Sequence, residues 1–294
     1  MVEFSQQTSN QYKLGFGGDT LNTAIYLARC GGETDYFTVL GNDPYSQDMK
    51  TAWEIEGVGI DHVKCTDNKM PGLYVIKNDN SGERYFHYWR DNSPARRLLS
   101  EFPEVFTSLS NYQMIFLSGI TLSLYSGEDL ATLFSFLSNY RKAGGKVVFD
   151  NNYRQRNWQS SAKAIQVFLQ MMSHVDIALL SFDDEITLYG EHSIDECMQR
   201  WREAGVSEIV IKNGQNGCSV YQNNSASIVP LDEICKPIDT TAAGDSFNGA
   251  YLAAKLRNEP IIECVKAGQA CASVVIMHKG AIIDRDISLQ GSLT

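Results

Sequence analysis

The chain has 294 residues and a formal net charge of −10, from 35 acidic side chains against 25 lysines and arginines. Nucleic acids and anionic membranes bind basic surfaces, so this charge argues against both as partners. An anionic small molecule remains compatible if cations gather locally. The length suits one large α/β domain with a small appendage as well as two domains, and we expect a single domain over residues 1–294.

The cysteines and apolar runs indicate a cytoplasmic protein. Neither a Cys-x-x-Cys pair nor a histidine cluster occurs, which argues against structural zinc and for reduced, buried thiols. The longest apolar runs, such as residues 114–117 and 177–180, are far too short to span a bilayer. The polar N-terminus shows no signal peptide. The seven cysteines are Cys30, Cys65, Cys197, Cys218, Cys235, Cys264 and Cys271.

A glycine-rich segment over residues 15–24 precedes an apolar pattern typical of a helix. Gly17 and Gly18 carry no side chain, so a ligand could approach the backbone closely. Asp19 and Asn22 offer polar atoms to sugar hydroxyl groups. The alternative is an ordinary helix start with Asp19 as its cap, and a glycine-rich opening alone favours that interpretation.

Residues 70–90 alternate apolar and polar positions around the turn Asn78-Asp79-Asn80-Ser81-Gly82, which predicts a β-hairpin. An antiparallel ribbon within an α/β chain suits a small lid, and we expect residues 1–18 and 68–92 to form it. The plainer alternative is an edge hairpin that covers the core. The aromatic side chains that could close over a ligand or contact a second subunit are Tyr74, Tyr85, Phe86, Tyr88 and Trp89.

From about residue 112 onward, short apolar runs alternate with helical patterns. This alternation predicts crossover units and a mostly parallel central sheet with helices on both faces. In such sheets ligands bind outside the carboxyl ends of the strands. Strands are predicted at 113–118, 146–150, 176–180 and 208–212, and helices at 127–142, 160–173, 193–204, after 244 and at 261–276.

Basic residues follow some of these elements. Arg154 after a strand and Arg90 on the hairpin are candidate cations for a carboxylate or phosphate. The alternative interpretation is that each arginine forms a surface salt bridge, which is common for arginine and contributes little to stability. Beyond Lys212, Gly214 and Gly217 permit a turn with positive φ whose N–H groups could meet nucleotide phosphates. An ordinary hairpin turn explains the same glycines, and both interpretations can hold together.

Two further segments carry weaker signals. Asp183-Asp184-Glu185 could help to hold hydrated Mg²⁺ through water, or could simply occupy a helix N-terminus, where acidic residues are favoured. His278-Lys279-Gly280-Ala281 could flank an adenine pocket or form a plain turn.

The most informative stretch is residues 239–250, where a run of small residues opens directly onto a helical pattern. Small residues at a helix start leave unpaired backbone N–H groups aimed outward, and the helix dipole favours an anion there. Asp245 lies one residue beyond the last small residue, where its carboxylate could accept a proton from a hydroxyl group. The alternative is that Asp245 merely caps the helix.

These segments resemble the ribokinase-like (PfkB) sugar kinases. Residues 239–245 are similar to the Asp-Thr-x-Ala-Ala-Gly-Asp signature of that family, and residues 17–22 to its Gly-Gly signature. Within the family, the likeness extends to the 2-keto-3-deoxygluconate kinases and covers nearly the whole chain. It implies a ribokinase-like fold and ATP-dependent phosphorylation of the sugar acid at its terminal 6-hydroxyl. The matching segments are 15–23, 71–74, 82–84, 88–90, 149–154, 238–247 and 280–283.

The resemblance also implies roles for single residues. Asp245 would be the catalytic base, beside an anion hole formed by Ala242, Ala243 and Gly244. ATP and Mg²⁺ would be required, a monovalent cation could be, and a homo-oligomer could form through the lid. The sugar acid would contact Gly18, Asp19, Asn22, Tyr74, Tyr88, Arg90 and Arg154. The nucleotide would contact Arg154, Ser181, Lys212, Gly214, Gly217, Ala243, Gly244 and His278.

The sequence departs from the family pattern in two places. Family members usually begin with an apolar strand before a segment like residues 1–5, so we expect the first core strand to be missing. An Asn-x-x-Glu motif linked to Mg²⁺ is replaced at residues 181–184, so no metal ligand is assigned. The alternative functions are a kinase for a neutral sugar such as fructose and a catalytically silent sugar-binding homologue.

Overall fold

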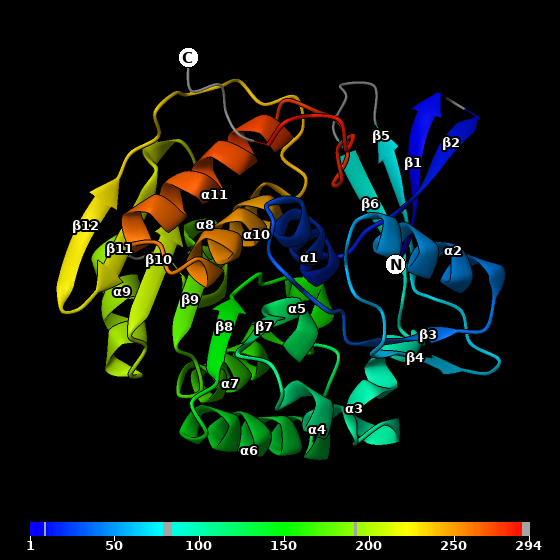
Figure 1. The fold of residues 1–294 in the computed structure, drawn as a ribbon, viewed down its shortest axis with the longest axis horizontal. Coiled ribbons are helices and arrows are strands. Elements are labelled where there is room, and N and C mark those ends of the chain that lie inside the picture. Colours follow the sequence, from blue (N-terminus) through cyan, green and yellow to red (C-terminus); the bar gives the residue numbers. More distant parts are fainter. Residues whose placement is uncertain (9, 79–83, 191–192, 290–294) are drawn as a thin grey trace.

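The central sheet carries the core of the molecule. A computed structural model describes residues 1–8, 10–78, 84–190 and 193–289. Within them, a six-stranded sheet has the order β12-β11-β10-β9-β8-β7 (Figure 1). Neighbours from β7 to β10 run parallel, and β11 and β12 continue the sheet antiparallel. This confirms the predicted mostly parallel sheet. The strands are β7 (Met114–Ser118), β8 (Lys146–Asp150), β9 (Ile177–Ser181), β10 (Glu208–Lys212), β11 (Cys218–Gln222) and β12 (Ser225–Val229).

Apolar side chains alternate between the two faces of this sheet. Val147 and Phe149 pack into one apolar cluster and Val148 into another, because successive side chains of a strand point to opposite sides. Strands buried on both faces need continuous apolar runs, which explains their sequences. One face is covered by α1 (Asp19–Arg29), α10 (Ala243–Leu256) and α11 (Ile261–Val275) (Figure 1). The other cluster includes α6 (Glu128–Lys142), α7 (Ser161–Met172), α8 (Phe182–Tyr189) and α9 (Ile194–Glu203).

A second sheet of four strands, called the lid sheet below, stands beside the central one (Figure 1). Its order is β2-β1-β5-β6, and the predicted hairpin is confirmed as the antiparallel pair β5 and β6. The centre of the predicted turn, residues 79–83, lies outside the described residues. Both the lid boundaries and the missing first core strand stay predictions. The strands are β1 (Val2–Thr8), β2 (Gln11–Phe16), β5 (Leu73–Asn78) and β6 (Arg84–Trp89).

The remaining elements are a small parallel sheet and several short helices. A parallel pair, β3 (Thr38–Gly41) and β4 (Val63–Thr66), flanks α2 (Pro44–Ile55). A cavity of about 570 Å³ is lined by residues of both β3 and β7, and Gly18, Asp19 and Arg90 also line it. The short helices are η1 (Pro94–Arg97), α3 (Leu98–Glu101), α4 (Val105–Leu109), α5 (Gly119–Leu122), η2 (Gln155–Asn157) and η3 (Gly214–Asn216).

All seven cysteines carry free thiols, as expected. Four of them are buried, whereas Cys65 is exposed, so the expectation that the thiols are buried holds only in part. Over residues 1–8, 10–78, 84–190 and 193–289, every helix is too short or too polar to cross a lipid bilayer.

Candidate active site

The turn that leads into α10 is held by one buried carboxylate. Asp239 accepts hydrogen bonds from the N–H and hydroxyl of Thr241 at 3.0 and 2.7 Å, and from the N–H of Gly280 at 2.6 Å. Ala242 then adopts a left-handed conformation with φ of 60°, which costs roughly 1–2 kcal/mol for a residue with a Cβ. The N–H of Ala243, the first residue of α10, donates to the carbonyl of Thr240 at 3.2 Å, and the next amides have no carbonyl of a preceding helical turn to accept their hydrogen bonds. The strained turn therefore presents an anion-binding helix start.

Asp245 lies in the first turn of α10 but does not cap it. The N-cap is Ala242, and the carboxylate Oδ2 of Asp245 instead accepts a hydrogen bond from Asn22 Nδ2 at 2.8 Å. Burial raises the pKa of Asp245 to about 7, with the charge of Asp19 adding to the rise and the Asn22 bond opposing it. A carboxylate that titrates near neutrality is suited to accept a proton from an alcohol. The capping interpretation is therefore wrong.

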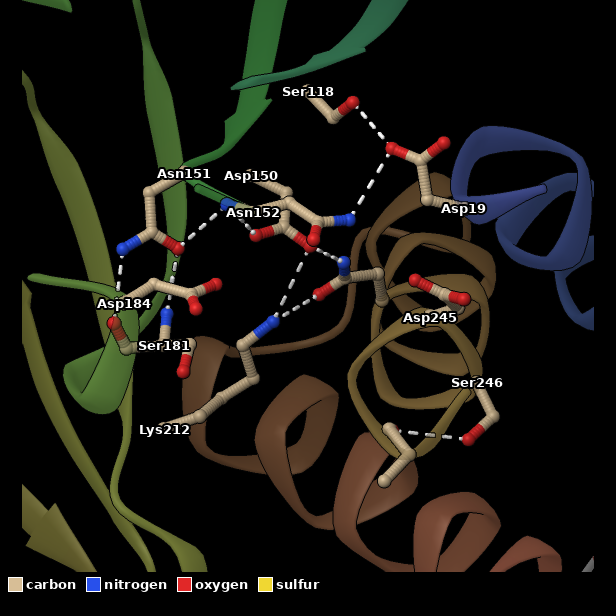
Figure 2. A network of polar contacts seen from close by, with 12 residues as sticks. Asp19, Ser118, Asp150, Asn151, Asn152, Ser181, Asp184, Lys212, Asp245 and Ser246 are labelled. Carbon is tan, nitrogen blue, oxygen red and sulfur yellow. Dashed lines mark hydrogen bonds and ion pairs between the residues drawn. The ribbon is translucent and has the colours of Figure 1, made fainter. Parts of the chain in front are cut away.

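Asp19 is the second carboxylate of this site, on the first turn of α1. Gly18 is the N-cap of α1, so Asp19 does not cap the helix either. The Oδ2 atom of Asp19 accepts hydrogen bonds from the Ser118 hydroxyl and from Asn152 Nδ2, the latter at 3.2 Å (Figure 2). Burial is the main reason that the pKa of Asp19 is raised. The start of α1 is thereby joined to the carboxyl ends of β7 and β8.

Lys212 brings a positive charge to the anion-binding helix start (Figure 2). Its Nζ donates to Asn248 Oδ1 at 2.9 Å and lies 3.6 Å from Asp150 Oδ2, which also accepts from Asn248 Nδ2 at 2.6 Å. A Cβ placed at Gly244 would lie 3.5 Å from Lys212 Nζ, so the ammonium group adjoins the first turn of α10. A lysine beside outward-facing amides suits the phosphates of a nucleotide.

The glycines beyond Lys212 form the predicted turn with positive φ, and this turn is a hairpin. Gly214 and Gly217 have φ of 50° and 79°, the positive values expected for the turn. β10 and β11 pair antiparallel across it, so it is also a hairpin. A Cβ at Gly217 would lie 2.3 Å from the carbonyl oxygen of Val229, which gives this glycine a packing reason of its own. Contact between this turn and nucleotide stays a prediction.

Arg154 extends from the carboxyl end of β8 toward the start of α8. It forms an ion pair with Asp184 at 2.9 Å. The side-chain amide of Asn151 bonds both the N–H and the carbonyl of Ser181 at 2.9 Å, which ties β8 to β9 (Figure 2). Asn151 Nδ2 also donates to the buried Glu185 at 3.1 Å. The acidic residues of α8 thus belong to structural networks as well as to the helix N-terminus.

The carboxylates of this site suit a Mg²⁺ ion that arrives bound to nucleotide phosphates better than one held by protein ligands alone. Among the residues that the structure describes, no three His, Cys, Asp or Glu side chains form a metal-binding group. Mg²⁺ commonly keeps several water ligands and binds substrate phosphates with one or two carboxylates. Asp150 and Asp184 are carboxylates at the same sheet edge, and their charges act on Arg154. They could contact such an ion through water.

The predicted lid residues gather over the start of α1. The rings of Tyr74 and Tyr88 stack with centroids 5.6 Å apart, and the Tyr74 hydroxyl donates to the buried Glu3. A Cβ at Gly17 would lie 2.4 Å from that hydroxyl, so only glycine allows the lid to approach this closely. Arg90 donates through Nη2 to Asn157 Oδ1, which connects the lid sheet to the segment after β8.

His278 is the predicted site residue with the weakest support. Its Nδ1 lies 2.9 Å from the carbonyl oxygen of Val274, within the end of α11. The neighbouring loop does contact the turn before α10, because the N–H of Ile238 donates to the carbonyl of Ile276 at 2.8 Å. An adenine contact by His278 stays a prediction.

Sequence reasoning did not assign Ser118, Asp150 or Asn248 to the site. Asp150 was given no role, although it is the last residue of a buried strand whose carboxyl end faces the ligand edge. Asn248 follows Asp245 by three positions and so shares its helix face. Ser118 carried no local signal, since only the packing of α1 against β7 brings its hydroxyl to Asp19.

The comparisons with known proteins agree with this geometry. The model of the pfkB family carbohydrate kinases matches residues 2–287. The chain is 43% identical to 2-dehydro-3-deoxygluconokinase of Dickeya dadantii, with 96% of this chain and 94% of that protein covered. It is 41% identical to the protein of the same name in Escherichia coli, with 97% and 95% covered. Fructokinase of Vibrio cholerae, solved with fructose, ADP and calcium, superposes with a TM-score of 0.83 at 25% identity, with 99% and 93% covered.

The predicted fold and enzyme class are thereby confirmed. A helix start that can hold an anion, next to a carboxylate with a raised pKa, agrees with the match to the family model over nearly the whole chain. The chain belongs to the pfkB family of carbohydrate kinases.

Proposed function

We propose that this kinase transfers the γ-phosphoryl group of ATP to the terminal 6-hydroxyl of 2-keto-3-deoxy-D-gluconate. The products are 2-keto-3-deoxy-6-phosphogluconate and ADP, in a sugar-acid catabolic route of the cytoplasm, where ATP is available. The observation that carries the proposal is Asp245, a carboxylate with a pKa of about 7 beside the start of α10. The relatives named 2-dehydro-3-deoxygluconokinase, at 41% and 43% identity, support the choice of substrate.

Asp245 acts as the base in this reaction. The oxygen of the 6-hydroxyl attacks the γ-phosphorus, and its proton passes to the Asp245 carboxylate. The new O–P bond forms while the bond from the γ-phosphorus to the β,γ-bridging oxygen breaks, so ADP leaves. The bond from Asn22 keeps one carboxylate oxygen oriented, and Asp19 is available to bind sugar hydroxyl groups.

The charge that develops on the phosphoryl group is stabilised by groups at the start of α10. The N–H of Ala243 donates to the carbonyl of Thr240, so the amide of Gly244 is the one that would meet the phosphoryl group, and Lys212 adjoins Gly244. Such preorganised positive groups commonly supply the largest part of the rate enhancement in reactions of this kind. Mg²⁺ bound with the nucleotide would neutralise further charge on the phosphates. A requirement for a monovalent cation stays a prediction.

Arg90, which directly follows β6, would favour a sugar acid over a neutral sugar. A guanidinium group binds a carboxylate in a bidentate geometry, which would orient the distant 6-hydroxyl toward Asp245. Closure of the lid would also exclude water and so limit ATP hydrolysis. The second candidate is a neutral-sugar kinase, favoured by the likeness to the fructokinase solved with fructose. A catalytically silent binder is less well supported, because it has no evident need for the strained turn before Asp245.

An ADP-release assay tests the proposal directly. The enzyme is offered 2-keto-3-deoxygluconate, fructose or ribose, and we expect the highest kcat/KM with the sugar acid. Asp245→Asn should lower kcat by at least about 100-fold, since general bases contribute 10²–10⁴-fold. Higher kcat/KM with fructose would establish the neutral-sugar kinase. Thermal stabilisation by the sugar acid without any ADP release would establish the silent binder.

The exposed face of the lid sheet supports association of two copies. Tyr12 and Leu14 on the edge strand β2 are 39 and 42% exposed, Trp89 on the opposite edge strand β6 is 60% exposed, and exposed apolar side chains can mark an interface. We propose a homo-oligomer through the lid. Light scattering should report more than one chain per particle, and Leu14→Asp should yield monomers. A wild-type protein that is monomeric at assay concentration would contradict this.

A further inference from the structure

Two guanidinium groups lie against one aromatic ring where the lid sheet meets the core. The ring belongs to Tyr88 on β6. Arg90, two residues later, holds its Cζ 4.7 Å from the ring centroid. Arg156 approaches the same ring at 3.6 Å from η2, which follows β8 of the central sheet. The pair therefore spans the two structural units that enclose the candidate active site.

Neither arginine is matched by a carboxylate. Across residues 1–8, 10–78, 84–190 and 193–289, no ion pair is formed by Arg90 or Arg156. The hydrogen bond that Arg90 makes goes to the neutral Asn157. Two such cations held near each other repel, and a protein of net charge −10 has acidic side chains in excess to pair with them. Both guanidinium groups are therefore available to an anion from outside the chain.

The electrostatics around Arg90 agree with this arrangement. Burial lowers the pKa of Arg90, and the nearby charges of Arg156 and Arg96 lower it further, whereas Tyr88 and Asp19 oppose them. Arg90 lines the same cavity as Gly18 and Asp19.

A single contact between an arginine and an aromatic ring is common in protein packing, whereas two arginines on one ring are not explained by packing alone. Arg202 lies 4.4 Å from the ring centroid of Tyr221, an ordinary cation–π contact on the surface. Tyr221 pairs with Ile209 near the amino end of β10, at the end of the sheet away from the site. At Tyr88, by contrast, two cations from different units share one ring. Their convergence is the feature that calls for a ligand.

We propose that Arg156 is a specificity-determining residue, which with Arg90 binds the C1 carboxylate of the sugar acid in a clamp of two guanidinium groups. This inference rests on the proposed function. A carboxylate has two oxygens, so each guanidinium can take one. A neutral ketose presents a hydroxymethyl group at the same position and leaves both cations without a counterion, which disfavours its binding.

The test compares Arg156→Ala and Arg156→Lys with a matched control, Arg202→Ala, which removes a similar exposed contact far from the site. Steady-state kinetics are measured with 2-keto-3-deoxygluconate, with ATP and with fructose. For Arg156→Ala we expect the KM for the sugar acid to rise about 10- to 100-fold, the range for a hydrogen-bonded charge. The KM for ATP and the kcat at saturation should stay within threefold. The preference for sugar acid over fructose should fall by a similar factor.

The conservative variant and the control complete the experiment. Arg156→Lys should recover part of the loss, since a single charge remains without the bidentate fork. Arg202→Ala should match the wild type, and all variants should share its melting temperature within a few degrees. A KM for the sugar acid within twofold of wild type in folded Arg156→Ala overturns the inference and leaves the proposed function intact. A wild-type enzyme that phosphorylates only neutral sugars overturns both.

Discussion

The hydrogen bond from Asn22 to Asp245 sets the pH at which the proposed base becomes active. Asn22 Nδ2 donates to Asp245 Oδ2 at 2.8 Å and stabilises the charged carboxylate, whose pKa is nevertheless raised to about 7 by burial. Asn22→Ala removes that donor, so the pKa must rise further. A hydrogen bond to a charged group contributes about 1.5–3 kcal/mol, and 1.36 kcal/mol corresponds to one pKa unit. The acid limb of the pH–rate profile should therefore move upward by about one to two pH units.

The direction follows from which form of Asp245 is active. The base works as a carboxylate, so activity rises with pH through its pKa and reaches a plateau above it. In the wild type the half-maximal kcat/KM for the sugar acid should fall near pH 7. The mutant should be poorly active there and recover toward its own plateau at higher pH. Because Asn22 is also a candidate sugar contact, the height of the plateau can change, and only the position of the limb is diagnostic.

The assay is a direct chromatographic measurement of ADP between pH 5.5 and 10, which avoids the pH dependence of coupling enzymes. Asn157→Ala serves as the control, since Asn157 contacts Arg90 and not Asp245. That variant should lower the plateau without moving the limb. If the limb of Asn22→Ala stays in place or moves to lower pH, the reasoning about Asp245 is refuted.

Three further predictions concern stability. Because the pKa of Asp245 is raised in the folded protein, ionisation of this carboxyl lowers the stability as pH rises from about 4 toward 7. Asp245→Asn should therefore have a higher melting temperature than wild type at pH 8 and the same melting temperature at pH 4. Equal melting temperatures at both pH values would contradict this prediction. Gly249→Ala would bring a Cβ within 2.7 Å of the carbonyl oxygen of Thr23, and should destabilise the protein by about 1–3 kcal/mol in urea unfolding; an unchanged midpoint would show that α1 and α10 can separate freely. Glu185→Ala removes the carboxylate that lies 2.8 Å from Arg200, and should lower the free energy of unfolding by about 3–5 kcal/mol. A loss below about 1 kcal/mol would contradict this, since it would mean that water replaces the ion pair.

The local elements could be predicted from the sequence because each depends on neighbouring residues. Apolar runs bounded by glycines determine the strands of the central sheet, and their burial on both faces requires such runs. Alternation around a polar turn likewise indicated the hairpin of β5 and β6. The helix start at Ala243 was readable because small residues, an outward-facing first turn and Asp245 are adjacent in the chain.

The two interpretations of Asp245 show where local reasoning ended. As a cap or as a base, an aspartate at a helix start looks the same in sequence. The cap is excluded because Ala242 is the N-cap of α10, and the Asp245 carboxylate instead accepts a hydrogen bond from Asn22, 223 positions away. Burial against α1 also raised the pKa, a property that no local pattern carries.

The composition of the site was decided by the tertiary structure. Asp150, Lys212 and Asn248 come from two strands and a helix, and they meet only because parallel strands present their carboxyl ends at one edge. Arg156 and Tyr88 approach each other because the lid sheet folds over the segment after β8. The sequence by itself determined the elements and the acid at the helix start, because those depend on short-range patterns. Packing determined the partners and the charge of each side chain, because both depend on distances between segments far apart in the chain.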